Sequence, residues 1–206
     1  MPTDPSANHA RLAPAAGKVN YRQMLRSLVR AVLLSLALLA APAVADDAAD
    51  RAALDKLFAQ LRVADDAETA QDLSTRIWAI WTSPSDPILA GRMREAIVAR
   101  STGELTSAIK LLDDLIADRP DYAEAWNQRA TIYYMMGDFE HSIADCEKVL
   151  ALEPRHYGAL SGRALMYLQQ GNRGLAIKDM AAALAIHPYL NERRLFPELG
   201  KPPTHI

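Results

Sequence analysis

Side chains able to do chemistry are few in this sequence. Cys146 is the only cysteine, and it lies between Ile143 and Val149 on the apolar face of an expected helix. That position is typical of a buried, inert thiol. The histidines show no H-E-x-x-H spacing and no cysteine partner, so we predict no metal site. The five histidines are His9, His141, His156, His187 and His205.

Catalytic motifs are also missing from the sequence. It has no G-x-S-x-G element and no glycine-rich phosphate loop, and no nucleophile stands at a recognisable spacing from a base. We therefore predict a protein without catalysis or a cofactor. An enzyme stays an alternative only if the fold brings a histidine next to a carboxylate in a deep pocket. Gly158 and Gly162, inside an expected helix, favour close approach of a neighbouring helix or a ligand over phosphate binding.

Two arginines, Arg129 and Arg163, stand 34 residues apart. Each directly precedes an alanine that repeats at the same spacing. We expect the arginine stem to pack on apolar surface and the guanidinium to pair with an acid of the adjacent helix, in preference to binding a ligand.

The same spacing organises the elements that would position these side chains. A glycine recurs every 34 residues and a proline follows each glycine by 17 residues, which indicates a helix-turn-helix repeat. Glycine supplies the left-handed turn between two helices, and proline ends the second helix. Asp138 can start a second helix, and Asp121 with Glu124 is a capping-box variant. The punctuating residues are Gly103, Gly137, Gly171, Pro120, Pro154 and Pro188.

Large and small side chains repeat in register with these glycines. The middle unit carries Trp126, Ala130, Tyr133, Gly137, Phe139, Ile143 and Pro154, and the third carries Ala164, Tyr167, Gly171, Ala176, Ile177 and Pro188. This pattern resembles the tetratricopeptide repeat (TPR), a 34-residue antiparallel helix pair, over roughly half of the chain. The resemblance implies an all-α fold, a right-handed α-solenoid of helix hairpins with units over 89–122, 123–156 and 157–188. The first unit is the weakest, because Arg92 and Ala99 replace the tryptophan and a tyrosine.

In this repeat family the first helix of each unit lines a concave groove. The resemblance implies that a peptide or protein binds in this groove, and the positive charges of Arg94 and Arg100 would suit an extended or helical peptide with an acidic group near them. Two alternatives stay open: the groove residues are only solvated, or the chain's own tail fills the groove. The carboxylate clamp of chaperone adaptors is absent, since its places hold Met93, Ile97, Gln128, Gly158 and Gly162. The candidate groove residues are Arg94, Ile97, Arg100, Asn127, Gln128, Thr131, Tyr134, Met135, Ser161, Leu165 and Gln169.

The amino-terminal 45 residues have the pattern of an extension and a cleavable signal peptide. Arginines lead into the uncharged run 31–41, and Ala43-Val44-Ala45 gives an A-x-A cleavage site before Asp46. The run is too short to span a bilayer, which takes about 20 residues. We expect a periplasmic or secreted bacterial protein without a stable membrane anchor, and a retained interfacial anchor is the alternative. Met24 is a second candidate start.

The chain from Asp46 onward carries 18 Lys and Arg against 24 Asp and Glu, a net charge of −6. It has no basic patch of the density that nucleic-acid binding needs. Residues 46–86 have two apolar stripes and read as a degenerate helical hairpin that covers the first repeat. Residues 189–206 read as a tail without a full closing helix, which leaves the apolar edge of the last helix pair partly uncovered.

These features predict a periplasmic protein-interaction module that binds a peptide or protein partner in its concave groove, without catalysis. The alternative is a structural subunit of a cell-envelope assembly or maturation complex, joined through convex or terminal surfaces. The uncovered carboxyl-terminal edge motivates that alternative.

Overall fold

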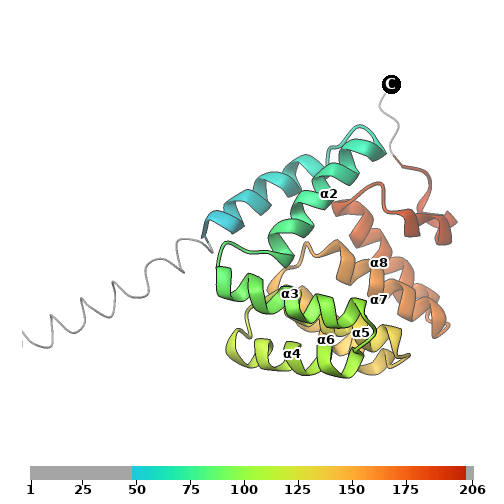
Figure 1. Ribbon diagram of the computed structural model, residues 1–206. Coiled ribbons are helices and arrows are strands. Elements are labelled where there is room, and N and C mark those ends of the chain that lie inside the picture. The colour runs from blue at the N-terminus through green and yellow to red at the C-terminus, as the bar shows by residue number, and fades with distance from the viewer. Residues whose placement is uncertain (1–47, 203–206) are drawn as a thin grey trace, which may run out of the picture. The chain divides into compact units, whose positions relative to one another are not determined.

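The described part of the chain is an array of antiparallel helix pairs (Figure 1). The computed structural model describes residues 48–202, and within them there are helices and no strands. A first helix covers residues 48–61. It is followed by α2 (Ala67–Thr82), α3 (Pro87–Ser101), α4 (Leu105–Asp118), α5 (Ala123–Met135), α6 (Phe139–Leu152), α7 (Tyr157–Gln169) and α8 (Arg173–Ile186). Two short 3-10 helices, η1 (Asn191–Leu195) and η2 (Pro197–Leu199), end this part.

The three repeating glycines turn the chain between the two helices of each pair. Gly103, Gly137 and Gly171 have φ angles of 83°, 78° and 77°, which is the left-handed region. A side chain at such a position costs roughly 1 kcal/mol or more, because its Cβ crowds the following carbonyl. The prediction of left-handed glycines at these positions is therefore confirmed.

Polar caps fix where several helices begin. The Asp66 carboxylate accepts the Thr69 N–H at 2.7 Å and starts α2. Asp138 starts α6 in the same way through the His141 N–H. The predicted capping box of Asp121 and Glu124 is wrong. The residue at the N-cap of α5 makes no side-chain cap, Asp121 pairs with Arg119 at 3.2 Å, and Glu124 is buried.

The pairs α3–α4, α5–α6 and α7–α8 stack into a solenoid. Successive pairs meet through α4 against α5 and α6 against α7, and the first helix α5 also contacts the first helices α3 and α7. The small residues Ala108, Ser142 and Ala176 are buried where the two helices of each pair approach. Small side chains let helix axes come close, so larger aliphatics can fill the space beside them. The all-α solenoid of helix hairpins is as the sequence predicts.

The N-terminal hairpin, residues 48–82, shares its buried core with the third helix pair and not with the first, although α2 also contacts α3. Its apolar side chains, among them Phe58, Ile77 and Trp81, form one core with Tyr157 and Leu160 of α7. The core of the first pair contains no residue from this hairpin. The prediction that the hairpin covers the first repeat is therefore wrong in its packing partner. Figure 1 shows the hairpin, in cyan to green, beside α7 and α8.

The segment after α8 folds back on that helix. Phe196 is completely buried in the core that also contains Met180 of α8. Arg173 at the start of α8 binds Glu198 at 2.6 Å. The apolar edge of the last pair is thus covered, contrary to the prediction, although the segment forms only η1 and η2 and no full closing helix.

The expected signal peptide, its cleavage site and Met24 lie outside the described residues. No helix between residues 48 and 202 is both long enough and apolar enough to cross a membrane.

Candidate functional site

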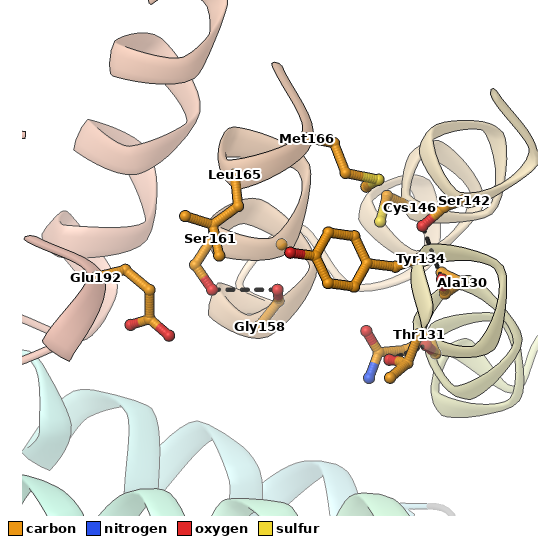
Figure 2. A pocket seen from close by; sticks show the side chains of 12 residues that line it. Ala130, Thr131, Tyr134, Ser142, Cys146, Gly158, Ser161, Leu165, Met166 and Glu192 are labelled. Atoms are coloured by element: carbon orange, nitrogen blue, oxygen red, sulfur yellow. Dashed lines mark hydrogen bonds between the residues drawn. The ribbon is translucent and has the colours of Figure 1, made fainter. Parts of the chain in front are cut away.

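A pocket of about 230 Å³ opens between the first helices α5 and α7 (Figure 2). We call it the α5–α7 pocket. Five of the predicted groove residues line it: Asn127, Thr131, Tyr134, Ser161 and Leu165. The remaining lining residues are Ala130, Ser142, Cys146, Gly158, Gly162, Met166 and Glu192.

The other candidate groove residues do not line this pocket. Arg94, Ile97 and Arg100 are on α3, and the structure does not bring them to the α5–α7 pocket. Gln128 is buried and donates through Nε2 to Glu124 Oε1 at 2.5 Å. Met135 is exposed at the end of α5, and Gln169, exposed at the end of α7, donates to the Tyr134 hydroxyl at 3.0 Å.

Glu192 is the lining residue that lies outside the repeats, and sequence reasoning missed it. It comes from η1, outside the repeats, so no 34-residue spacing points to it. In Figure 2 it lies across the pocket from Tyr134, with Ser161 of α7 between them. The C-terminal segment therefore contributes one side chain to the wall of the groove.

Three of the four hydroxyl groups that line the pocket donate to backbone carbonyls, and the fourth, that of Tyr134, only accepts from Gln169. Ser161 Oγ donates to the Gly158 carbonyl at 3.2 Å, and Thr131 Oγ1 donates to the Asn127 carbonyl at 2.9 Å. Ser142 Oγ donates to the Ala130 carbonyl at 2.7 Å. Since each hydroxyl has a single proton, these three oxygens can only accept a hydrogen bond from a ligand.

Cys146 lies in the same wall as a buried thiol. Burial raises its pKa to about 12, so the reactive thiolate is scarce near neutral pH. The prediction of a buried cysteine is confirmed, and the thiol contributes apolar surface to the pocket.

Between residues 48 and 202, two histidines stand next to carboxylates. His141 Nδ1 lies 2.7 Å from Asp138 Oδ2 at the exposed start of α6, and neither residue lines the α5–α7 pocket. In the other pair, His156 and Glu124, both side chains are fully buried. His156 Nε2 lies 3.0 Å from Glu124 Oε2, and neither side chain is exposed. The Ala159 N–H donates to His156 Nδ1 at 3.1 Å, so Nε2 carries the proton and donates to Glu124. Trp81 stacks on the imidazole. The pair therefore joins the starts of α5 and α7 and offers no group to a substrate.

A second hollow of about 350 Å³ lies beside this buried pair. Residues of the N-terminal hairpin, among them Leu54 and Trp81, face Arg119, Asp121 and Tyr122 there. Its charges are already paired in part, since Arg119 binds Asp121 at 3.2 Å and Asp86 at 3.7 Å. Candidate groove residues do not line this hollow.

The repeated arginines have a structural role. Arg163 binds Asp179 of α8 through two nitrogens, at 2.7 and 3.0 Å. Arg129 binds Asp145 of α6 in the same way, at 2.8 Å twice, and also Asp113 at 2.6 Å. These hydrogen bonds raise the pKa of both guanidinium groups further above its usual value. The predicted pairing with an acid of the adjacent helix is confirmed.

The chain is similar to known repeat proteins. The tetratricopeptide repeat model matches residues 123–156. A TPR repeat-containing protein of Rhizobium etli is 37% identical over 97 residues, which are 47% of this chain and 48% of that protein, so the chain spans about half of that relative's length. The crystal structure of MamA is 21% identical with a TM-score of 0.44, covering 64% of this chain and 71% of that one. The family match and the relative, together with the observed helix pairs, support the interpretation of this chain as a tetratricopeptide repeat protein.

Proposed function

We propose that this chain is a non-catalytic interaction module that binds a segment of a partner protein at the α5–α7 pocket. The observation that carries the proposal is the pocket itself, an open hollow between two first helices of the array. First helices line the concave face of such solenoids, and concave faces are the usual binding surfaces.

The size of the pocket limits what enters it. At about 230 Å³ it is smaller than the roughly 300–1,000 Å³ of sites that enclose drug-sized ligands. One long side chain of a partner fits, while the flanking backbone crosses the exposed rim at Met135 and Gln169. The N-terminal hairpin covers Tyr157 and Leu160 of α7, so the partner occupies the part of α7 nearer its carboxyl end.

We also propose that the protein works outside the cytoplasm, in the periplasm or as a secreted protein. The support is the arginine-led apolar run followed by Ala43-Val44-Ala45. Amino-terminal sequencing of the protein from its native cell should find Asp46 first. An intact Met1 or Met24 would contradict export with cleavage.

Affinity capture tests the binding proposal. In Thr131→Arg a long side chain fills the pocket, and Thr106→Arg, on the exposed surface of α4, is the matched control. Partners captured from periplasmic extract should be lost with Thr131→Arg and kept with Thr106→Arg, at an unchanged melting temperature. The same partner set with both variants would contradict binding at this pocket.

A structural subunit of an envelope complex has less support. That alternative depended on an uncovered edge of the last helix pair, and Phe196 is buried in the core beside that pair.

A further inference from the structure

We infer that the α5–α7 pocket takes a cationic side chain, a lysine of the partner, with Glu192 as its counter-charge. The inference rests on the proposed function and specifies the chemistry of the partner at the same site.

The first observation is the charge of the pocket. Glu192 is the one acidic side chain among the lining residues, and no lysine or arginine lines the pocket. Among residues 48–202, its carboxylate has neither a hydrogen-bond partner nor an ion-pair partner, although Arg193 and Arg194 follow it in the chain. A half-buried carboxylate at the wall of a neutral pocket attracts a positive group.

The second observation is the direction of the hydrogen bonds in the wall. The Ser161 and Thr131 hydroxyls have given their protons to backbone carbonyls. The Asn127 amide nitrogen donates to both oxygens of Glu124 at 3.2 Å, so the Asn127 amide oxygen is left as an acceptor. The one hydroxyl that keeps its proton is that of Tyr134, which accepts from Gln169. The pocket therefore presents mostly acceptors, which favours a ligand that brings donors.

The third observation is the apolar part of the lining. Ala130, Leu165 and Met166 lie in the same pocket as the acceptors. A lysine combines an apolar four-carbon stem with an ammonium of three donors, which matches an apolar wall with acceptors at its end. A glutamate or aspartate would meet a like charge and would find few donors.

The interaction with Glu192 is worth measuring because a charge-assisted hydrogen bond is stronger than a neutral one. We expect a lysine peptide to bind at least about tenfold more tightly than a peptide of the same shape without the charge. Because the pocket is open to solvent, salt should weaken this preference.

The test is an NMR titration of the ¹⁵N-labelled chain from Asp46 onward. The probes are acetylated, amidated alanine pentapeptides that carry lysine, norleucine or glutamate at the centre. Glu192→Gln is the test variant, and Glu198→Gln, which changes a carboxylate paired with Arg173 away from the pocket, is its matched control. Amide shifts of Tyr134, Ser161 and Leu165 report binding at the pocket.

The inference predicts that the lysine peptide shifts these amides with at least about tenfold higher affinity than the norleucine peptide. Glu192→Gln should bring the two affinities to within about twofold, and Glu198→Gln should leave the preference intact. Equal binding of lysine and norleucine, tighter binding of glutamate, or a preference unchanged by Glu192→Gln would overturn the inference. Butylammonium binding as tightly as the lysine peptide would indicate a small-amine site and would overturn a polypeptide ligand.

These outcomes separate the inference from the proposed function. If partner capture is lost with Thr131→Arg while the lysine preference is absent, the interaction module stands and the cationic ligand is wrong. If the lysine preference is present while Thr131→Arg captures the same partners as the wild type, the pocket chemistry is supported and the proposed function is contradicted.

Discussion

The imidazole of His156 lies flat on the indole of Trp81, with ring centroids 4.0 Å apart and ring planes 5° from parallel. Trp81 belongs to α2, and His156 caps the start of α7. The Trp81 carbonyl also accepts the Tyr122 hydroxyl, just before α5. One residue of the N-terminal hairpin thus holds the starts of two first helices, so the hairpin is part of the solenoid core.

Trp81→Ala should destabilise the fold by about 3–5 kcal/mol, because a large buried ring is removed and the His156–Glu124 pair is uncovered. The matched control is Trp78→Ala, three residues earlier on α2, where the residue is 41% exposed. Trp78→Ala should lower the free energy of unfolding by less than about 1 kcal/mol. Urea unfolding followed by circular dichroism measures both, and similar losses for the two variants would contradict the packing of the hairpin.

Arg163→Lys should lower the free energy of unfolding by about 1–2 kcal/mol, because lysine cannot make the two parallel hydrogen bonds that Arg163 makes to Asp179. Arg76→Lys changes an exposed pair with Asp72, at 3.6 Å, and should cost less than about 0.5 kcal/mol. The comparison uses urea midpoints at one salt concentration. If Arg163→Lys unfolds at the wild-type midpoint, the two-nitrogen contact has no structural role.

Alanine should have opposite effects at two glycines. Gly137→Ala should lower the free energy of unfolding by about 1 kcal/mol, since the φ of 78° at this position is in the left-handed region. The penalty should come from the backbone alone, because the added Cβ would meet no atom within 4 Å. Gly162→Ala lies inside α7, also with free space, and should stabilise by about 0.5–1 kcal/mol. Thermal unfolding of the two variants measures both changes in stability. A gain at position 137 would show that the left-handed turn is not required.

The sequence predicts the repeating part of the fold because the repeat supplies its own evidence. Glycines, small residues and the arginine–aspartate pairs recur at one spacing, and each recurrence repeats one local contact. The partner of the N-terminal hairpin could not be predicted in this way. Its apolar stripes show that one face is buried, but a stripe of leucines fits the first helix pair as well as the third.

Only those residues of the candidate site that lie inside the repeats could be predicted from the sequence. Thr131, Tyr134 and Ser161 stand at positions that the repeat places on first helices. Glu192 lies beyond the last repeat, and only the fold-back of η1 brings it to the pocket. Arg94 and Arg100 were expected to set the charge of the ligand, yet the pocket lies away from them and has the opposite charge.

The protein should lose stability between pH 7 and pH 4 in a way that His187 controls. Burial lowers the pKa of His187 to about 4, below the value near 6.5 expected in the unfolded chain. Between these values the unfolded state binds more protons, so the free energy of unfolding falls as the pH drops. We expect His187 to account for roughly 1–2 kcal/mol of that loss.

His187→Gln measures this contribution. The variant should show a smaller difference in urea midpoint between pH 7 and pH 4.5 than the wild type, because it has no imidazole to protonate. An identical difference in both proteins would mean that the folded state accepts the proton at His187 without cost.

Site-specific photocrosslinking tests the central claim, binding at the α5–α7 pocket, most directly. A photoreactive residue replaces Met135, on the rim at the end of α5, or Lys148, on the exposed face of α6. We predict one discrete partner crosslinked in native cells from position 135, not from position 148, and lost when Thr131→Arg fills the pocket. Crosslinking that is equal from both positions, or that persists with Thr131→Arg, would contradict the claim.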